Sequence, residues 1–409
     1  MNQWAWRTVN DVAERVAVGP FGSSIKVDTF VPSGVPVISG QHLRESRLND
    51  SSGYNFVSRE HAARLSRALV RRGDVILTHA GTIGQVALIP RDSAYEEYII
   101  SQRQFYIRCN RTAMEPTFLT YYLRSQRGQH DLLANASYSG VPSIAQPSSY
   151  VKTLSIPVPP LAEQQAIADV LGALDDKIIA NTTLSDLALA YADSSFPPGG
   201  TPARLGEMVS ITKGNSYRSV DLVPSETALV TLKSIGRDGR YVEGGLKEYA
   251  GAYRADQVLR ADEIVVAQTD LTQAADVVGR AVRVPSSSYR TLIASLDLAI
   301  VRPVTDIEPM YLLGLLRQSA FREHCRSNTT GTTVLHLRSG AMEEFTAGVA
   351  AEGVQQKYAA LAAPLIAQSD ALATENRTLA ATRDALLPQL MSGKLRVRDA
   401  ERIAEEAGV

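Results

Sequence analysis

PVPPLAEQQAIADVLGALDDKI, at residues 157–178, joins a proline run to a strongly helical segment. One apolar seam follows spacings of four, three and four residues, at Ile167, Leu171, Leu174 and Ile178. That spacing places the four side chains on one face of an α-helix, which predicts a long helix over about 161–192. Pro160 would fix where the helix begins. The stretch has no histidine, cysteine or glycine-rich phosphate loop, so it shows no catalytic signal.

A second long helix is predicted over about 354–392. Its leucines repeat every seven residues, the period of a left-handed coiled coil, at Leu365, Leu372, Leu379 and Leu386. The alternate seam positions are polar, at Gln368, Glu375 and Thr382. Such a seam is too weak for a leucine zipper and favours two helices lying side by side with a partly hydrated interface. Pro364 and Pro388 are expected to kink this helix, and Gly393 to cap it.

The sequence repeats itself at a long interval. EPTFLTYYLR (115–124) returns as EPMYLLGLLR (308–317), and Gln164-Gln165 returns as Gln355-Gln356. Residues 71–90 resemble 260–285, and VPVISGQHL (35–43) resembles ALVTLKSIG (228–236). All four matches keep the same order, which indicates a tandem duplication of a unit of roughly 190 residues.

Each repeat has the same coarse plan. Short alternating apolar stretches broken by Gly, Pro and Ser read as strands and turns, and a short helix, a polar loop and a long helix follow. The predicted fold is therefore α/β (α+β), with two tandem mixed units separated by two long antiparallel coiled-coil helices in a pseudo-two-fold arrangement. A helical hairpin of a larger enzyme, or two core helices, would give the same periodicity.

Composition excludes several classes of protein. No run of about 18 apolar residues occurs, so no membrane span is expected. The cysteines, Cys109 and Cys325, match no metal or redox spacing and suit a reducing cytoplasm. Residues 1–160 carry 17 basic and 12 acidic side chains, a net charge of +5, whereas residues 161–200 carry one basic and six acidic side chains, a net charge of −5. A DNA-binding protein needs a local basic patch, which this distribution permits.

No catalytic or metal-binding motif is found. The histidines form no HExxH and no paired metal spacing, at His42, His61, His79, His130, His324 and His336. GTIG (81–84) reads as a tight turn, because no helix follows it to cradle a phosphate. We therefore expect a binding or scaffolding protein that is not an enzyme by itself, with no metal or cofactor of its own.

Several residues suit contact with DNA, although a solvated surface explains each of them equally well alone. Arg64, Arg67 and Arg71 would share one face if their segment is helical. Gln102 and Arg103 are the residue types that pair with adenine and guanine. Lys233 directly precedes the loop SIGRDGRY, and it clusters there with Arg237 and Arg240.

The opening stretch resembles the central conserved region of the specificity subunit of type I restriction-modification enzymes. ENRTLAATRDALLPQLMSGKL (375–395) resembles the distal conserved region of that family. GPFGSSIK (19–26), which ends on Lys26, and VPVISGQHL resemble the start of its first target recognition domain, and VAQTDLTQAADVVG (266–279) resembles part of the second. The resemblance extends over essentially the whole chain.

The resemblance implies two target recognition domains, at 1–155 and 197–350, each reading one half of a bipartite DNA target. It implies a central spacer helix at 156–196, a distal spacer helix at 351–395 and a C-terminal tail at 396–409. Double-stranded DNA, two modification subunits with S-adenosylmethionine, and restriction subunits that use ATP and Mg²⁺ would be the partners. The helices would set the spacer and dock the modification subunits through Gln164, Gln165 and the two apolar seams. In the second copy only the glutamine pair and part of the apolar pattern persist, which puts equal docking in doubt. Two alternatives stay open: a structural adaptor that does not touch DNA, and a target-recognition partner of a fused methyltransferase-nuclease.

Overall fold

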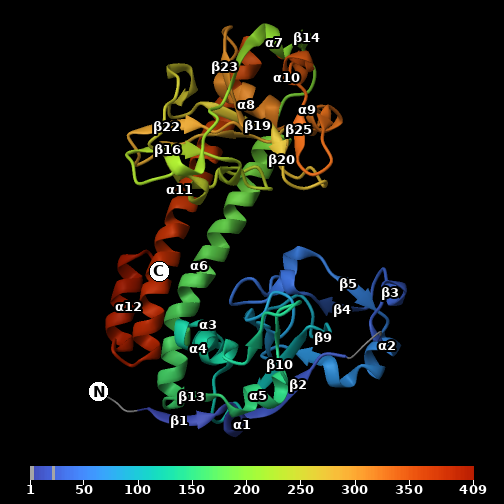
Figure 1. The fold of residues 1–409 in the computed structure, drawn as a ribbon, viewed down its shortest axis with the longest axis vertical. Coiled ribbons are helices and arrows are strands. Elements are labelled where there is room, and N and C mark those ends of the chain that lie inside the picture. The colour runs from blue at the N-terminus through green and yellow to red at the C-terminus, as the bar shows by residue number, and fades with distance from the viewer. Residues whose placement is uncertain (1–3, 21–23) are drawn as a thin grey trace. The chain divides into compact units, whose positions relative to one another are not determined.

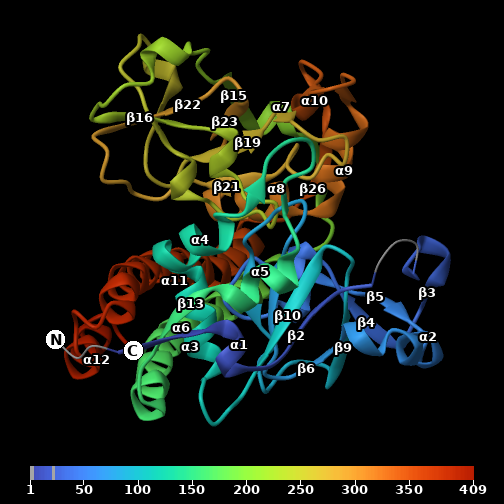
Figure 2. The same ribbon diagram turned by 60° about the horizontal axis from the view of Figure 1, so that its bottom comes forward.

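The computed structural model describes residues 4–20 and 24–409 and divides into two compact units. Unit 1 contains the chain up to Ala180 together with Glu375–Val409, and unit 2 contains Asn181–Thr374. Part of the motif GPFGSSIK, at 21–23, lies outside the described residues. Figures 1 and 2 show the elements of both units.

The two larger sheets of unit 1 have four and five strands. The first has the order β2-β10-β7-β8 and is antiparallel, and the second has the order β3-β5-β4-β9-β6, in which β4 and β9 run parallel. The central strand β10 buries Phe105 and Ile107 in one core cluster and Tyr106 in another, because successive side chains point to opposite faces. The strands are β1 (Ala5–Thr8), β2 (Ala13–Val18), β3 (Phe30–Val31), β4 (Val35–Ile38), β5 (Asn55–Val57), β6 (Leu69–Arg71), β7 (Val75–Thr78), β8 (Val86–Leu88), β9 (Glu97–Ile100), β10 (Gln104–Cys109), β11 (Ala136–Ser137), β12 (Ser143–Ile144) and β13 (Ser155–Val158).

Short helices join these sheets to the long ones. Helix α3 starts where predicted, with Pro116 at its first position and the Glu115 side chain accepting from the Thr117 N–H. In Figure 1, α3 and α4 lie between the strands of unit 1 and helix α6. The short helices of unit 1 are α1 (Val9–Val12), α2 (Arg59–Arg64), α3 (Pro116–Arg124), α4 (Gln126–Leu133) and α5 (Pro147–Thr153).

Unit 2 repeats this plan. Its antiparallel sheet has the order β15-β23-β19-β21, which matches β2-β10-β7-β8 strand for strand, and its parallel pair β16 and β22 matches β4 and β9. This agreement confirms the tandem repeat. The strands are β14 (Thr201–Arg204), β15 (Val209–Lys213), β16 (Thr227–Val230), β17 (Lys247–Glu248), β18 (Val258–Leu259), β19 (Ile264–Ala267), β20 (Thr269–Asp270), β21 (Ala281–Arg283), β22 (Thr291–Ala294), β23 (Leu298–Pro303), β24 (Thr329–Thr330), β25 (Leu335–Leu337) and β26 (Thr346–Val349), and the helices are α7 (Leu205–Met208), α8 (Pro309–Arg317), α9 (Ser319–Ser327) and α10 (Ala341–Glu344).

The two long helices are α6 (Leu161–Ser194) and α11 (Glu352–Met391), and each contributes to both units. In unit 1, Asp175 of α6 binds Arg383 of α11, and the Ile178 carbonyl accepts from Asn376. Residue numbers thus rise along α6 as they fall along α11, so the two helices are antiparallel there. Helix α11 continues through both of its prolines and ends before Gly393, whose positive φ of 66° suits a glycine cap.

The end of the sequence differs from the predicted tail. Residues Val397–Glu406 form helix α12, which Figures 1 and 2 show beside α11. Its apolar positions recur at helical spacing, and Ala400 and Ala404 are buried in the core of unit 1. Burial of this face explains why the segment is ordered. No helix in the described part of the chain is long and apolar enough to cross a membrane.

Candidate nucleic-acid interface

Three chain segments meet at one edge of unit 1, which we call recognition edge 1: residues 79–85, 101–104 and 137–143. The His79 N–H donates to the Arg103 carbonyl at 2.9 Å, and the Gly81 N–H donates to the Pro142 carbonyl at 2.9 Å. Gly81 and Gly84 take positive φ angles of 81° and 82°, which makes the tight turn predicted for GTIG. None of the three segments contains Asp or Glu, so this edge carries no charge that repels phosphate.

A hollow of ≈ 470 Å³ lies beside this edge, with the side-chain amides of Gln41, Asn55 and Gln102 in its lining. His42, which is buried, fixes one wall of the hollow. Its Nδ1 accepts from the Ser39 N–H at 2.9 Å, its Nε2 donates to the Gly53 carbonyl at 2.8 Å, and its ring stacks on Tyr54 at 4.2 Å. Hydrogen bonds and ring stacking therefore hold this wall of the hollow in place.

Recognition edge 2 occupies the same place in unit 2, at residues 268–280, 295–298 and 330–336. Thr269 pairs with His336, which ties two of these segments together. This edge differs in character, since it contains the Asp297 carboxylate and two exposed leucines, Leu271 at 67% and Leu296 at 40% exposure. Burial acts to raise the pKa of Asp270, but hydrogen bonds from Val277, Thr272 and Val278 outweigh it and lower that pKa.

The predicted DNA-binding residues fall into separate groups. Lys26, Gln102, Arg103 and Lys233 are exposed, and Gln102 and Arg103 belong to recognition edge 1. Arg237 is 71% exposed and lies 3.7 Å from Asp276. Arg240 is largely enclosed, because its guanidinium binds Asp238 at 2.6 Å and Asp186 of α6 at 3.2 Å. Arg240 therefore holds unit 2 together internally and presents no free cation.

The predicted row of Arg64, Arg67 and Arg71 is wrong. Helix α2 ends at Arg64, and Leu65 leaves the helical conformation with its N–H donating to two preceding carbonyls. Arg71 lies at the end of strand β6, which pairs with β9. The chain turns into the sheet because Val70 enters the core. The three arginines are exposed but share no helix face.

The duplicated glutamines form the same internal lock in both units. Gln164 is fully buried; its Oε1 accepts from the Glu115 N–H at 2.8 Å and its Nε2 donates to the Pro159 carbonyl at 2.8 Å. In unit 2, Gln355 accepts from the Glu308 N–H at 3.0 Å and donates to the Ala350 carbonyl at 2.8 Å. Each lock joins the start of a long helix to the start of the short helix that follows an EP dipeptide. Gln165 and Gln356 are exposed.

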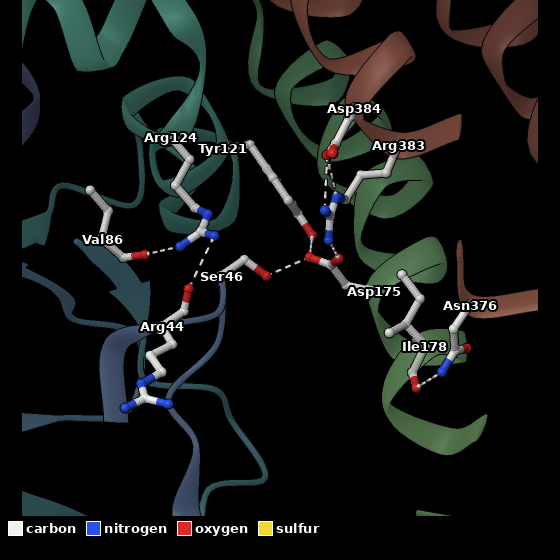
Figure 3. A network of polar contacts seen from close by, with 10 residues as sticks. All are labelled: Arg44, Ser46, Val86, Tyr121, Arg124, Asp175, Ile178, Asn376, Arg383 and Asp384. Atoms are coloured by element: carbon white, nitrogen blue, oxygen red, sulfur yellow. Dashed lines mark hydrogen bonds and ion pairs between the residues drawn. The ribbon is translucent and has the colours of Figure 1, made fainter. Parts of the chain in front are cut away.

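A buried carboxylate joins helix α3 and the loop around Ser46 to both long helices within unit 1. Figure 3 shows Ser46, Tyr121 and Arg383 converging on Asp175. The Ser46 hydroxyl, the Tyr121 hydroxyl at 2.6 Å and the Arg383 guanidinium at 2.6 Å all donate to it. Burial acts to lower the pKa of Arg383, but its pairing with Asp175 and Asp384 raises that pKa overall. We call this cluster the Asp175 hub.

Unit 2 uses a different attachment. Arg317 of α8 donates to both carboxylate oxygens of Asp193 on α6, at 2.7 and 2.8 Å, and to the Gly239 carbonyl at 2.8 Å. Arg283 of β21 binds Asp370 of α11. Four acidic residues of α6 are thus paired inside the units: Asp175, Asp176, Asp186 and Asp193.

The predicted seam residues also pack inside the units. Ile167, Leu171, Leu174, Leu379 and Leu386 are buried, and Ile178, Leu365 and Leu372 are half-buried. Sequence analysis missed an exposed apolar stripe on the unit 2 part of α6, at Leu184, Leu187 and Tyr191, which are 44%, 63% and 57% exposed. Their spacing of three and four residues was the signal that could have identified it.

The described residues contain no group of three or more His, Cys, Asp or Glu side chains that could hold a metal ion. Cys109 and Cys325 are both buried, and burial raises the pKa of each thiol to about 12. A thiol with so high a pKa is a poor nucleophile at neutral pH.

Comparisons with known proteins agree with this geometry. The family model described as "Type I restriction modification DNA specificity domain" matches residues 1–187. The type I restriction enzyme MjaIX specificity subunit of Methanocaldococcus jannaschii is 23% identical over 97% of this chain and 94% of its own length. The putative type I restriction enzyme MjaX specificity subunit of the same organism is 25% identical over 43% of this chain and 40% of its own.

A solved structure has the same fold. It is the type I restriction-modification system S subunit from M. genitalium, with a TM-score of 0.59 and 16% identity over 95% of this chain and 97% of that one. Residues 1–187 therefore match the DNA specificity domain of type I restriction-modification systems, and the chain is similar over nearly its whole length to a specificity subunit of such a system. Specificity subunits of this family are not enzymes by themselves and carry no cofactor of their own.

Proposed function

We propose that each unit of this chain reads one half of a bipartite, asymmetric DNA target, unit 1 through recognition edge 1 and unit 2 through recognition edge 2. The single observation that carries this proposal is the repeat itself. The strand framework is the same in both units, whereas the exposed turns differ in charge and chemistry. A shared scaffold with different exposed turns is what two readers of unlike sequences require.

We assign the two long helices to the unread spacer and to partner binding. Helix α6 has 34 residues and α11 has 40, so each is far longer than packing one domain requires. The exposed stripe of Leu184, Leu187 and Tyr191 gives a modification subunit an apolar surface on α6. Two modification subunits would bring S-adenosylmethionine, and restriction subunits would bring ATP and Mg²⁺, to DNA in the cytoplasm.

The main test is to sequence the methylated bases in cells that lack other DNA methylation and express this chain with its modification subunit. The expected result is one bipartite motif with a fixed spacer. Replacing residues 1–155 by the corresponding domain of a relative should change one half-site only. Deleting seven residues from both long helices should shorten the spacer and leave the half-sites unchanged. A changed half-site after that deletion would refute the spacer role.

The salt dependence of DNA affinity distinguishes a DNA-binding subunit from a structural adaptor that does not touch DNA. The affinity of the assembled complex for target DNA should fall steeply as salt rises, because phosphate contacts release counterions. A complex that assembles but never binds DNA would favour the adaptor. A single bifunctional partner copurifying with this chain would favour a fused methyltransferase-nuclease.

A further inference from the structure

The two units place the same four-residue turn at the same point of the fold. Residues 101–104 join β9 to β10, and residues 295–298 join β22 to β23. In unit 1, the Gln104 N–H donates to the Ser101 carbonyl at 3.1 Å, and in unit 2 the Leu298 N–H donates to the Ser295 carbonyl at 2.9 Å. A glycine at the end of the neighbouring strand donates to the last residue of each turn, at 2.8 Å in unit 1 and 3.0 Å in unit 2.

The turn of unit 1 is held rigidly through its backbone. His79 binds both carbonyls at its centre: its N–H donates to Arg103 at 2.9 Å, and its Nε2 donates to Gln102 at 3.2 Å. Burial lowers the pKa of His79, although its backbone hydrogen bonds act to raise that pKa. The buried Gln104 side chain accepts from the Ser101 N–H at 2.9 Å.

The side chains at the centre of this turn are available for a ligand. Gln102 and Arg103 are exposed, and neither side chain has a hydrogen bond or ion pair with any residue that the structure describes. A Cβ at Gly81 would come within 3.2 Å of the Arg103 Nη1, so the absence of a side chain there leaves room for the guanidinium. Both side chains therefore offer free donors from a fixed backbone.

The turn of unit 2 has the opposite chemistry on the same frame. The Gln268 N–H donates to the Asp297 carbonyl at 2.8 Å, as His79 does to Arg103. The Asp297 Oδ1 accepts from the Thr269 hydroxyl at 2.9 Å, and across the described residues its Oδ2 has no donor. Leu296, which precedes it, is 40% exposed. This turn therefore presents a fixed acceptor beside an apolar side chain.

We propose that these two turns contact bases in the major groove and select opposite classes: a purine at Gln102-Arg103 and a cytosine at Leu296-Asp297. This inference rests on the proposed function. Only purines present the N7 acceptor that an amide or guanidinium can reach, and guanine adds O6. A carboxylate repels those acceptors and the phosphates, but it accepts from the cytosine N4 amino group. Leu296 then packs against the apolar C5 edge of the same pyrimidine.

The first experiment exchanges the turns in the full chain, expressed with its modification subunit. Leu296→Gln with Asp297→Arg should change one position of the second half-site from cytosine to a purine, with the first half-site and the spacer unchanged. Gln102→Leu with Arg103→Asp should make the reverse change in the first half-site. Arg290→Asp is the control, because Arg290 lies at the opposite end of β22 and its side chain is 83% exposed. Methylation that persists with both half-sites unchanged overturns the inference and leaves the proposed function standing.

The second experiment keeps the protein unaltered, so a folding defect cannot confuse it. The wild-type complex is titrated with target duplexes in which one base carries a single changed atom or group. Replacing the purine at the unit 1 turn by its 7-deaza analogue should weaken binding about tenfold, since N7 is lost. Replacing the cytosine at the unit 2 turn by 2-pyrimidinone, which lacks the N4 amino group, should do the same. Equal affinity for natural and modified duplexes overturns the inference. Absence of any bipartite target for the wild-type complex would instead overturn the proposed function.

Discussion

The two units share one glutamine lock at the start of each long helix, but they attach to these helices through different ion pairs and hydrogen bonds. Gln164 and Gln355 make matching bonds, each accepting from the backbone N–H of the glutamate that precedes a short helix. Beyond that lock, unit 1 gathers three donors on the single buried carboxylate of Asp175, whereas unit 2 spreads its attachment over the pairs Arg317–Asp193 and Arg283–Asp370. The two units thus keep the same strand framework, while different interactions hold each framework to the long helices.

The largest effect is expected at the Asp175 hub. Asp175→Ala would leave the Arg383 charge and two hydroxyl groups without their buried acceptor, which costs about 3–5 kcal/mol of unfolding free energy in unit 1. Asp169→Asn is the control, because Asp169 is exposed on the same helix and accepts only from Gln165. Chemical denaturation of the full chain, followed by hydrogen exchange in each unit, would measure this loss of unfolding free energy. A loss shared equally by both units would contradict the hub.

The glutamine locks should show equal effects in both units. Gln164→Ala and Gln355→Ala each leave a partly buried backbone N–H without its acceptor, so each should cost about 1–3 kcal/mol of unfolding free energy. The exposed neighbours provide matched controls: Gln165→Ala and Gln356→Ala should change that free energy by about 0.5 kcal/mol or less. If only one of the two substitutions lowered the unfolding free energy, the two locks would not be equivalent.

The attachments of the two short helices should respond unequally. Arg124 and Arg317 occupy the same repeat position, but Arg124 donates to backbone carbonyls and Arg317 holds the Asp193 carboxylate at two points. A lysine cannot make two parallel bonds. Arg317→Lys should therefore lower the free energy of unfolding by about 1–2 kcal/mol, and Arg124→Lys should lower it by less than about 1 kcal/mol. Thermal unfolding of the paired variants tests this, and the reverse order would refute it.

The smallest effect concerns pH. Burial acts to raise the pKa of Glu263, but hydrogen bonds from Arg302 and Arg260 outweigh it and lower that pKa. A carboxyl group whose pKa falls on folding stabilises unit 2 fully above its unfolded pKa, and that contribution is lost as pH falls through the folded pKa. We expect Glu263→Gln to flatten the loss of stability between about pH 5 and 3, by about 1 kcal/mol or less. Urea unfolding midpoints at several pH values would measure this change. If stability fell with pH as steeply in the variant as in the wild type, Glu263 would have no such role.

The sequence predicted the elements that periodicity and repetition encode. The seam of α6, the start of α3 at Pro116 and the paired units all follow from local spacing. The attachments could not be predicted, because Asp175 meets Ser46 and Arg383 across 129 and 208 residues of sequence. The arginine row was wrong because charge spacing says nothing about where Leu65 leaves the helix.

The candidate site was predicted only where residue type and a turn coincide. Gln102 and Arg103 carry side chains that suit bases and lie in an exposed turn. Their counterparts Leu296 and Asp297 stand in no motif that marked them in the sequence, and the shared backbone bonds identify them. Arg240 carries the expected charge, but its partners Asp186 and Asp238 come from tertiary structure.

The division of the chain has a consequence for its biosynthesis. Unit 2 is one continuous segment, whereas unit 1 needs Glu375–Val409 to be complete. A ribosome delivers the N-terminal residues first, yet the unit that begins first would be finished last. Until Leu379 and Leu386 emerge, the growing chain carries the apolar seam of α6 without its cover. A nascent chain paused after residue 374 should therefore hold a protected unit 2 and a protease-sensitive unit 1.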